Sequence, residues 1–493
     1  MNISFNPKYF LKPDKGRALL MASFVGRNLA TEVNDSFTNA IHPIYAMILC
    51  FTDGREQSAC IAEASKELEV PEDLIENFIS SLLDNPNQVA LKSKNGTSFF
   101  PPQTIISNKD LKPSRRYTPT MFEYDKVDLR MRRHLTPSTL TLMVNNICMT
   151  NCIYCYQDKT KKVDCTIPLD RIKEIIHEAY RLHVNTFDVI GGEFFLYKHW
   201  KDVLYELRSY GFNPYLSTKV PLKEEDIQFL AKLNIHDIQI SLDTLIEEHL
   251  IDSINVQKGY AEKMRKSILL LDKYEIPVMV HSVLTKYNNT SEDMQSVFEL
   301  LKDMKHLHSW HVVKGDDSLY PKTDYNTIEI SQSDQINMVK YLMQLKEKSG
   351  MPIFYPQIPQ NGNIDSADHF KVKEYKFFKR SFCSGLFSSL YILPDGKVTI
   401  CEQLYWHKQF IVGDVLKNTI EEIWNSQAAK DLYYIKQEQI PSDSLCHSCE
   451  KYEACRSLRQ VCYRDIIKKY GKERWYYPDA NCPYVKENLQ NEK

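Results

Sequence analysis

The sequence has little glycine, no long apolar segment and no excess of charge of one sign. Glycine contributes only 15 of the 493 residues, about half of the usual ~7%. No apolar run reaches the roughly 18 residues that a membrane helix needs, which excludes a membrane-spanning helix. The N-terminus has neither the apolar segment nor the small-residue cleavage site of a secretory signal peptide. We therefore expect a cytoplasmic protein with no membrane partner.

The balance of charges argues against chain-wide binding to nucleic acid. The 62 basic and 64 acidic residues give a formal net charge of -2, so no general attraction to phosphates or anionic lipid is expected. Hydrophobic residues make up 43% and charged residues 26%, close to the averages of globular domains. The chain should therefore fold, and its length predicts about three domains of roughly 150 residues.

The 13 cysteines are too few for a small disulfide scaffold, and an odd number cannot all pair. In the reducing cytoplasm, clustered cysteines more often bind metals than form disulfides. Ten of them lie in two clusters, whereas Cys50, Cys60 and Cys165 stand apart and are interpreted as structural. The spacing within the two clusters therefore carries the functional information.

Residues 1–106 show the pattern of a small winged helix. Two strand-like segments, 9–11 and 17–21, flank a turn and predict a hairpin. Helical periodicity follows, and a wing-like pair of strands ends the region. The helices are expected at 44–51, 58–68 and 71–83, and the wing at 89–99. A polar, basic stretch then begins a linker that we place at 107–135.

The expected third helix does not suit DNA. Residues 71–84 contain Glu72, Asp73, Glu76 and Asp84 without any Lys or Arg. Such a helix would repel the phosphates of a nucleic acid. Nucleic acid is therefore not expected as a partner.

Short apolar strands alternate with longer helical stretches over residues 136–350, which is the pattern of a parallel sheet. The strands are expected at 139–144, 186–190, 214–217, 237–242, 278–284 and 310–313. Six strands do not complete the eight of a closed barrel, so we expect an α/β fold with a partial (β/α)6 barrel. Residues 352–380 look like a poorly patterned connection, and a cysteine-rich domain is expected at 351–493.

Three cysteines follow the first barrel strand. Cys148, Cys152 and Cys155 lie where α/β barrels build their ligand sites. Iron–sulfur clusters are normally held by four thiolates, so three local ligands would leave one iron open to a small molecule. The alternatives are a zinc site completed by a distant residue, or a reactive loop.

This Cx3Cx2C loop resembles that of the radical S-adenosylmethionine (radical SAM) enzymes, in which an aromatic residue precedes the third cysteine. Tyr154 fills that place, and the resemblance implies that it lies beside the adenine of SAM. Gly191, Gly192 and Glu193 are similar to the family's GGE motif, which meets the methionyl amine. Ser241, in a Ser-Leu-Asp sequence on the fourth strand, corresponds to a residue that reaches the ribose. The resemblance implies a 5′-deoxyadenosyl radical as the reactive species.

One further match is incomplete. Ser217, Thr218 and Lys219 follow the third strand, where relatives often carry Thr-Asn-Gly. No role is assigned to them from the sequence, and no acid–base residue can be named.

The seven C-terminal cysteines resemble the SPASM extension of radical SAM enzymes that modify peptides, which binds two auxiliary [4Fe–4S] clusters. The resemblance assigns Cys446, Cys449, Cys455 and Cys482 to the far cluster, and Cys383, Cys401 and Cys462 to the nearer one. A zinc site using four of the seven is the alternative.

Two features of this region depart from the family pattern. Six residues rather than three separate Cys455 from Cys462, and Arg459 occupies the expected place, so Cys462 is interpreted as a displaced ligand. Some relatives have a further cysteine just before the first ligand, but residues 366–382 contain none. An iron of the nearer cluster would then be open to a substrate thiolate, which is the basis for expecting thioether formation.

The N-terminal pattern is similar to a RiPP recognition element, a winged-helix module that binds the leader of a ribosomally made precursor peptide. Leaders commonly dock there by adding a strand to the sheet edge. The alternative is a purely structural cap.

Together these features identify the chain as resembling a radical SAM/SPASM peptide maturase with SAM and three [4Fe–4S] clusters. The expected reaction removes a hydrogen from a precursor peptide and forms a crosslink, most plausibly from a Cys sulfur to carbon. Alternatives are a carbon–carbon crosslink, oxidation of a residue, or a non-catalytic iron–sulfur electron carrier. A reductant such as flavodoxin or ferredoxin is the other expected partner.

Overall fold

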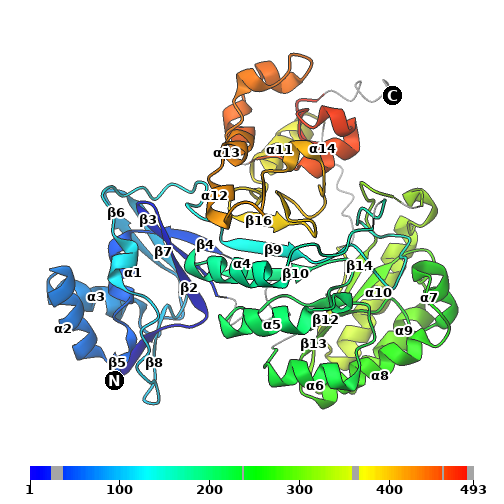
Figure 1. Ribbon diagram of the computed structural model, residues 1–493, viewed down its shortest axis with the longest axis horizontal. Helices are drawn as coiled ribbons and strands as arrows, with labels where there is room; N and C mark the ends of the chain where they lie inside the picture. Colours follow the sequence, from blue (N-terminus) through cyan, green and yellow to red (C-terminus); the bar gives the residue numbers. More distant parts are fainter. Residues whose placement is uncertain are drawn as a thin grey trace. The chain divides into compact units, whose positions relative to one another are not determined.

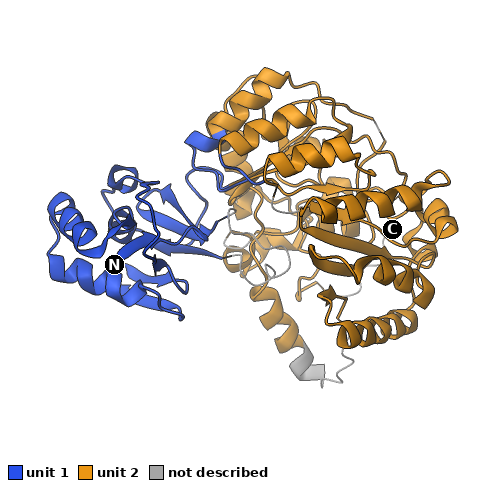
Figure 2. Ribbon diagram, turned by 90° about the horizontal axis from the view of Figure 1, so that it is seen from below, with its two compact units in different colours: residues 1–138, 179–186, 211–213 blue, residues 139–178, 187–210, 214–493 orange. Residues whose placement is uncertain are grey.

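The computed structural model describes residues 1–23, 37–160, 162–235, 238–321, 323–357, 366–457 and 460–485. The chain folds into two compact units (Figure 2). The first comprises residues 1–138, 179–186 and 211–213, and the second comprises 139–178, 187–210 and 214–493. Residue 237, where the fourth barrel strand was expected to begin, and Arg459 lie outside the described residues. No helix in the described ranges has both the length and the apolar character needed to cross a bilayer.

The first unit has the predicted winged-helix-like fold. Its hairpin forms as expected from β2 (Tyr9–Asp14) and β3 (Arg17–Ala22), and β4 (Thr38–Ile41) adds a third antiparallel strand. A second sheet has the order β5-β1-β8 and the wing is β6-β7. These elements are β1 (Asn2–Phe5), β5 (Asp53–Glu56), β8 (Ile105–Ser107), β6 (Val89–Ser93) and β7 (Gly96–Phe100).

Three helices complete this unit close to their predicted positions. They are α1 (Pro43–Leu49), α2 (Gln57–Leu68) and α3 (Glu72–Leu82). Proline is tolerated in the first turn of α1 because its missing N–H has no intrahelical partner there. One apolar cluster joins the helices to the strands, with Ile3, Phe51, Ile79 and Phe100 fully or almost fully buried.

A buried cation lies in strand β2. Lys12 is fully buried, and its ammonium donates to the Leu182 carbonyl at 2.7 Å, to the His183 carbonyl at 3.0 Å and to Thr136 Oγ1 at 2.8 Å. Burial lowers the pKa of Lys12 to about 7, against a smaller opposing effect of Asp14. The folded protein therefore binds this proton less tightly than the unfolded chain does.

This buried cation predicts a dependence of stability on pH. Between about pH 7 and about pH 10 the unfolded chain holds a proton on Lys12 that the folded chain releases, so stability rises with pH over this window. We expect the thermal midpoint of Lys12→Met to rise less than that of the wild type from pH 7 to about pH 9, by a few °C. Parallel pH profiles of the two proteins would contradict the assignment. Differential scanning calorimetry at matched ionic strength makes the measurement.

The second unit contains the partial barrel, with all six predicted strands. Its strands lie in two sheets, ordered β10-β9-β16-β17-β18 and β11-β12-β13-β14-β15, and helices lie outside the strands (Figure 1). The barrel strands are β9 (Thr139–Met143), β10 (Thr186–Ile190), β11 (Ser217–Thr218), β12 (Ile238–Ser241), β13 (Val278–Leu284) and β14 (Leu307–Lys314). The helices are α4 (Leu169–Arg181), α5 (Trp200–Ser209), α6 (Glu224–Lys232), α7 (Glu247–Ile254), α8 (Tyr260–Lys273), α9 (Ser291–Leu301) and α10 (Gln332–Ser349).

The third barrel strand is shorter than predicted and begins later. Proline has no N–H to donate to a ladder, and Pro214 stands at the predicted start. The N–H of Tyr215 donates to the side-chain Oδ1 of Asp188 at 2.8 Å. Regular pairing therefore begins only at Ser217.

The prediction of a poorly patterned connection at 352–380 was wrong. This segment contains β15 (Ile353–Phe354), which pairs in parallel with β14, and helix α11 (Ser366–Phe378). A two-residue strand is too short to show periodicity. The closely spaced lysines of α11 hide its apolar face in the sequence.

The C-terminal part continues the barrel sheet. Strand β16 (Ser389–Ile392) pairs in parallel with β9, from Ser389 opposite Thr139 to Ile392 opposite Leu142. Antiparallel strands β17 (Lys397–Thr399) and β18 (Gly413–Asp414) follow. The helices after them are α12 (Ile420–Trp424), α13 (Gln427–Tyr433) and α14 (Tyr463–Tyr470). This pairing places the segment between Cys383 and Cys401 beside the strand that leads to Cys148.

Candidate active site

A cavity of about 650 Å³ lies at the carboxyl ends of the barrel strands. Cys148, Cys152 and Cys155 all line it, as do residues at the ends of β10 to β14. Ligand sites of α/β sheets form at this edge because the loops after the strands converge there. The structure therefore brings the three cysteines of the first cluster to one ligand-sized space.

The cysteine loop is held by its own hydroxyl and by the end of helix α7. Thr150 Oγ1 lies 3.2 Å from Cys148 Sγ and 3.3 Å from Cys152 Sγ. The N–H groups of Asn151 and Ile153 donate to carbonyls at the end of α7, at 2.8 and 3.0 Å. Burial raises the pKa of the Cys152 thiol, whereas Lys219 acts to lower it. The loop thus has a fixed backbone path around the cavity.

The adjacent glycines bring β10 against this loop. The N–H of Gly192 donates to the Asn145 carbonyl at 2.7 Å. A Cβ on Gly192 would lie only 2.2 Å from the carbonyl oxygen of Ile147, which directly precedes Cys148. Only glycine permits so close an approach. The second glycine of the pair therefore shapes the cysteine loop.

Glu193 is a buried carboxylate with backbone donors. Its side chain accepts the N–H of Phe195 at 3.3 Å and the N–H of Lys219 at 3.1 Å. Burial raises the pKa of Glu193 to about 7 despite these hydrogen bonds. A cationic ligand in the cavity would stabilise the charged form of this carboxylate. A methionyl ammonium group is a ligand of this kind.

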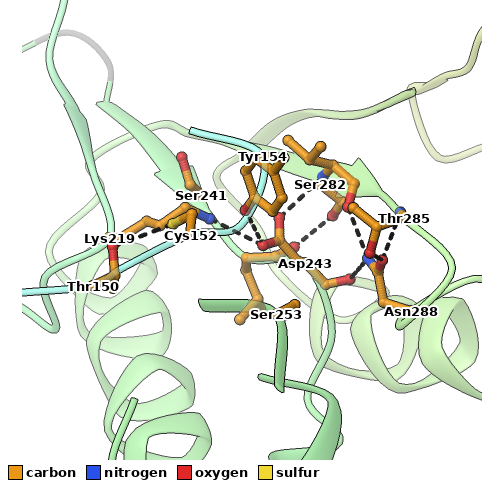
Figure 3. Close-up of polar contacts among 12 residues, drawn as sticks. Thr150, Cys152, Tyr154, Lys219, Ser241, Asp243, Ser253, Ser282, Thr285 and Asn288 are labelled. Carbon is orange, nitrogen blue, oxygen red and sulfur yellow. Dashed lines mark hydrogen bonds and ion pairs between the residues drawn. The ribbon is translucent and has the colours of Figure 1, made fainter. Parts of the chain in front are cut away.

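A second buried carboxylate anchors Tyr154 and Lys219 (Figure 3). Asp243 accepts a hydrogen bond from the Tyr154 hydroxyl and pairs with the Lys219 ammonium at 3.1 Å. Its other oxygen accepts the N–H of Val283 at 3.0 Å. Burial alone would lower the pKa of Lys219, but the charges of Asp243 and Cys152 outweigh it and the pKa is raised. A charged lysine therefore stands beside the cysteine loop.

Sequence reasoning missed this lysine as a site residue. Lys219 follows β11 where the family resemblance was incomplete, so the pattern gave it no role. Its position directly after a barrel strand could have indicated a site residue, because side chains at such positions reach the cavity. The position of Asp243 after β12 gave the same indication.

Ser241 also lines the cavity. Its Oγ accepts a hydrogen bond from Gln239 Nε2 at 3.3 Å, and the same amide donates to Ser217 Oγ at 2.8 Å. Tyr215 donates to the Oε1 of this glutamine. Ser241 thus belongs to a polar wall formed by β11 and β12.

Two substitutions separate the roles of the Tyr154 ring and its hydroxyl. Removing the ring in Tyr154→Ala should weaken SAM binding by roughly tenfold or more, because a base stacked on an aromatic ring gains about 1–3 kcal/mol. Tyr154→Phe keeps the ring, and Asp243 keeps Lys219, so we expect a change of less than about threefold. Isothermal titration calorimetry with the reconstituted protein measures both. Equal affinities for the two variants would argue against an adenine beside this ring.

Residues next to two of the nearer C-terminal cysteines, Cys401 and Cys462, line the same cavity. Burial raises the pKa of the Cys401 thiol to about 12, and Glu402, Cys383 and Cys462 contribute in the same direction. Glu402 and Gln403, which follow Cys401, line the cavity, and so does Arg464, which follows Cys462 by two residues. Arg464 donates to Gln403 at 3.2 Å. The two segments that carry the nearer cysteines thus form a wall of the cavity that contains Cys148.

The far cysteines surround a second cavity. Cys446, Cys449, Cys455 and Cys482 all line it, together with Phe377 and Phe378 at the end of α11. Gln437 Nε2 donates to the carbonyls of Cys446 and Cys449, at 3.0 and 2.9 Å. Four thiols around one apolar space match the four thiolates that an iron–sulfur cluster takes.

The three remaining cysteines, Cys50, Cys60 and Cys165, line neither of these two cavities. Cys50 and Cys60 are buried in the core of the first unit, and Cys165 Sγ lies 3.8 Å from the Ile167 carbonyl. Within the described ranges, no three His, Cys, Asp or Glu side chains are grouped around a point where one metal ion could bind all of them, whereas the four thiolates of an iron–sulfur cluster each bind a different iron. The fit to clusters therefore rests on the two cysteine-lined cavities.

Comparison with known proteins agrees with this geometry. The model of the Radical SAM superfamily matches residues 142–301, and that of the SPASM iron–sulfur cluster-binding domain matches residues 383–450. The chain therefore contains a radical SAM domain and a SPASM domain.

One similar protein is a maturation protein by name, and another has been solved with a bound precursor peptide. The sporulation killing factor maturation protein SkfB of Bacillus subtilis strain 168 is 22% identical over 296 residues, which cover 58% of this chain and 64% of that protein. Streptococcus suis SuiB bound to S-adenosylmethionine superposes with a TM-score of 0.62 at 13% identity, covering 97% of this chain and 99% of that chain. SuiB bound to its precursor peptide SuiA gives the same TM-score at 14% identity. The SuiB likeness confirms the fold over nearly the whole length.

Proposed function

We propose that this enzyme matures a ribosomally made precursor peptide by forming a crosslink, most plausibly a thioether from a Cys sulfur to carbon. One observation carries the proposal: the 650 Å³ cavity is lined both by the first cysteine cluster and by residues next to Cys401 and Cys462. A substrate in this space would contact both regions at once. The names of SkfB and of the SuiB complex with SuiA support a peptide substrate.

The cavity residues would divide the work of binding SAM. Cys148, Cys152 and Cys155 would hold a [4Fe–4S] cluster, and Gly191, Gly192 and Glu193 would receive the methionyl amine. Tyr154 would lie beside the adenine and Ser241 near the ribose. When bound and reduced, the cluster and SAM would supply the radical chemistry that removes a hydrogen from the substrate. The protein fixes the position of the reacting groups.

The C-terminal cysteines would hold two further clusters. Cys446, Cys449, Cys455 and Cys482 would bind the far one, and Cys383, Cys401 and Cys462 the nearer one. Three ligands would leave an iron of the nearer cluster available for a substrate thiolate, and this supports a thioether over a carbon–carbon bond. Three [4Fe–4S] clusters correspond to about twelve iron atoms per chain, which elemental analysis of the reconstituted protein measures.

The first unit would recognise the leader of the precursor. Its antiparallel sheets offer edges to which a peptide strand can add. A cytoplasmic flavodoxin or ferredoxin would supply electrons. In this assignment the domains are the recognition element at 1–106, the linker at 107–135, the barrel at 136–350 and the cluster domain at 351–493.

Co-expression with the short open reading frames adjacent to the gene tests the function. A thioether predicts a peptide that has lost two hydrogens per crosslink and whose cysteine no longer reacts with iodoacetamide. Cys148→Ala is the inactive control. Loss of two hydrogens with a reactive cysteine would indicate a carbon–carbon bond or residue oxidation instead. A protein that reduces and reoxidises its clusters but never cleaves SAM would be an electron carrier, and the proposal would fail.

A further inference from the structure

Helix α11 has one strongly basic face. Lys371, Lys373, Lys376 and Lys379 are all exposed. At 100° per residue, they cover a continuous arc of the helix and its final turn, which we call the lysine face. Glu374 lies outside this arc and accepts a hydrogen bond from the Tyr484 hydroxyl. Among residues 370–379, whose side chains the structure describes, no carboxylate lies between these lysines on the outer side of the helix.

The opposite face of the same helix closes the far cysteine cavity. Phe377 and Phe378 line that cavity, and Phe370 packs edge-on against Tyr484 with ring centroids 5.9 Å apart. Arg380, just after the helix, donates to Cys455 Sγ at 3.3 Å and lies over the Phe377 ring at 4.0 Å. The helix is thus fixed directly against the proposed cluster ligands.

Only the width of α11 separates the lysine face from the far cavity. An electron can cross this distance, whereas a bulky substrate has little access to the cavity. A helix with its side chains is about 10–12 Å across, so a protein seated on the lysine face would lie within one helix diameter of the far cavity. Aromatic side chains fill the space between. Lys451 also lines the far cavity. The exposed Glu450 and Glu453 lie one and two residues from Lys451 in the sequence, and they only partly offset the positive charge of the lysines.

We propose that the lysine face of α11 is the docking surface for an acidic one-electron carrier protein, which exchanges electrons with the far cluster. The inference rests on the proposed function, because it requires a cluster held by Cys446, Cys449, Cys455 and Cys482. In each transfer the reduced carrier loses one electron and a [4Fe–4S]2+ cluster gains it. No bond is made or broken and no proton has to move. Opposite charges on the two surfaces would steer the encounter.

Charge reversal on the helix provides the test. Fully reduced flavodoxin is mixed anaerobically with the reconstituted full-length protein, and its oxidation is followed by stopped-flow absorbance. We expect Lys376→Glu/Lys379→Glu to lower the second-order rate constant at least tenfold at low salt, and the difference to shrink near ~1 M salt. The matched control is Lys263→Glu/Lys266→Glu, an exposed i,i+3 pair on α8, which should stay within about twofold of the wild type.

Several outcomes would overturn the proposal. They are an unchanged rate in the α11 variant, an equal fall in the α8 control, or salt-sensitive binding of the precursor peptide rather than flavodoxin to the lysine face. If the double reversal lowers the iron content, Lys371→Gln/Lys373→Gln replaces it and must slow the reaction at least threefold.

Dithionite separates this inference from the proposed function. As a small reductant it needs no docking surface, so the α11 variant should cleave SAM at the wild-type rate with dithionite. If the wild type does not cleave SAM with dithionite, the proposed function fails, whereas the flavodoxin rates still decide whether α11 docks a carrier. If the α11 variant alone is slow with dithionite and retains its iron, the lysines act on the chemistry and the docking proposal is overturned.

Discussion

Replacing Cys148 by alanine should lower SAM cleavage by about a thousandfold or more. The three thiols of this loop line one cavity, and the resemblance implies that each binds one iron of the radical-generating cluster. Breaking the C–S bond of SAM would need an electron from a cluster held by this loop, and no protein side chain would replace that electron source. Chromatography of 5′-deoxyadenosine formed under reducing, anaerobic conditions measures the loss.

The matched control is another cysteine in the same unit. Cys165→Ala removes a thiol that does not line the cavity and whose Sγ lies 3.8 Å from a backbone carbonyl. We expect it to keep its SAM cleavage and about twelve iron atoms, whereas Cys148→Ala should keep about eight, since the two auxiliary clusters remain. Full SAM cleavage by Cys148→Ala would remove the assignment of this loop. An equal loss in Cys165→Ala would show that the effect comes from folding.

Gly192→Ala should lower SAM cleavage by about a hundredfold, although it adds only one methyl group. The new Cβ would lie 2.2 Å from the Ile147 oxygen and 2.5 Å from the backbone carbon of Asn146. Both are backbone atoms, so the cysteine loop has to move. Displacements of about 1 Å near reacting groups cost roughly 10²-fold in rate. Gly192 does not have a positive φ, so space rather than backbone freedom causes the effect.

A second glycine separates loss of space from loss of stability. Gly350 follows α10 with φ of +70°, and nothing lies within 4 Å of the position a Cβ would take. Gly350→Ala should reduce stability by about 1 kcal/mol and leave SAM cleavage unchanged. Thermal melts and product assays on both variants make the comparison. If Gly192→Ala were fully active, the glycine pair would not shape the cluster loop.

Local patterns predicted most elements of this fold. Apolar runs bounded by turns placed β9, β10 and β13 almost to the residue, because buried parallel strands are short and continuously apolar. The hairpin of β2 and β3 was equally clear from its turn. The cysteine spacings and the glycine pair predicted the residues of one wall of the cavity, because each of these motifs lies within a short segment of the sequence.

Features that depend on distant partners could not be predicted. The pairing of β16 with β9 joins segments about 250 residues apart, and nothing in either strand names the other. The Lys219–Asp243 pair forms between loops after different strands, so neither residue alone indicated a site. The helical periodicity of α11 was not recognised, because its lysines are interspersed among its apolar residues along the sequence.

The pairing of β16 with β9 has a consequence for how the enzyme can be divided. Strand β9 has β10 on one side and β16 on the other, so a chain ending before β16 would expose a full row of unpaired N–H and C=O groups. Exposed edges of this kind promote association with other chains. The barrel and the cluster domain therefore form one indivisible folding unit, and an isolated barrel fragment would aggregate rather than act as a smaller SAM-cleaving enzyme.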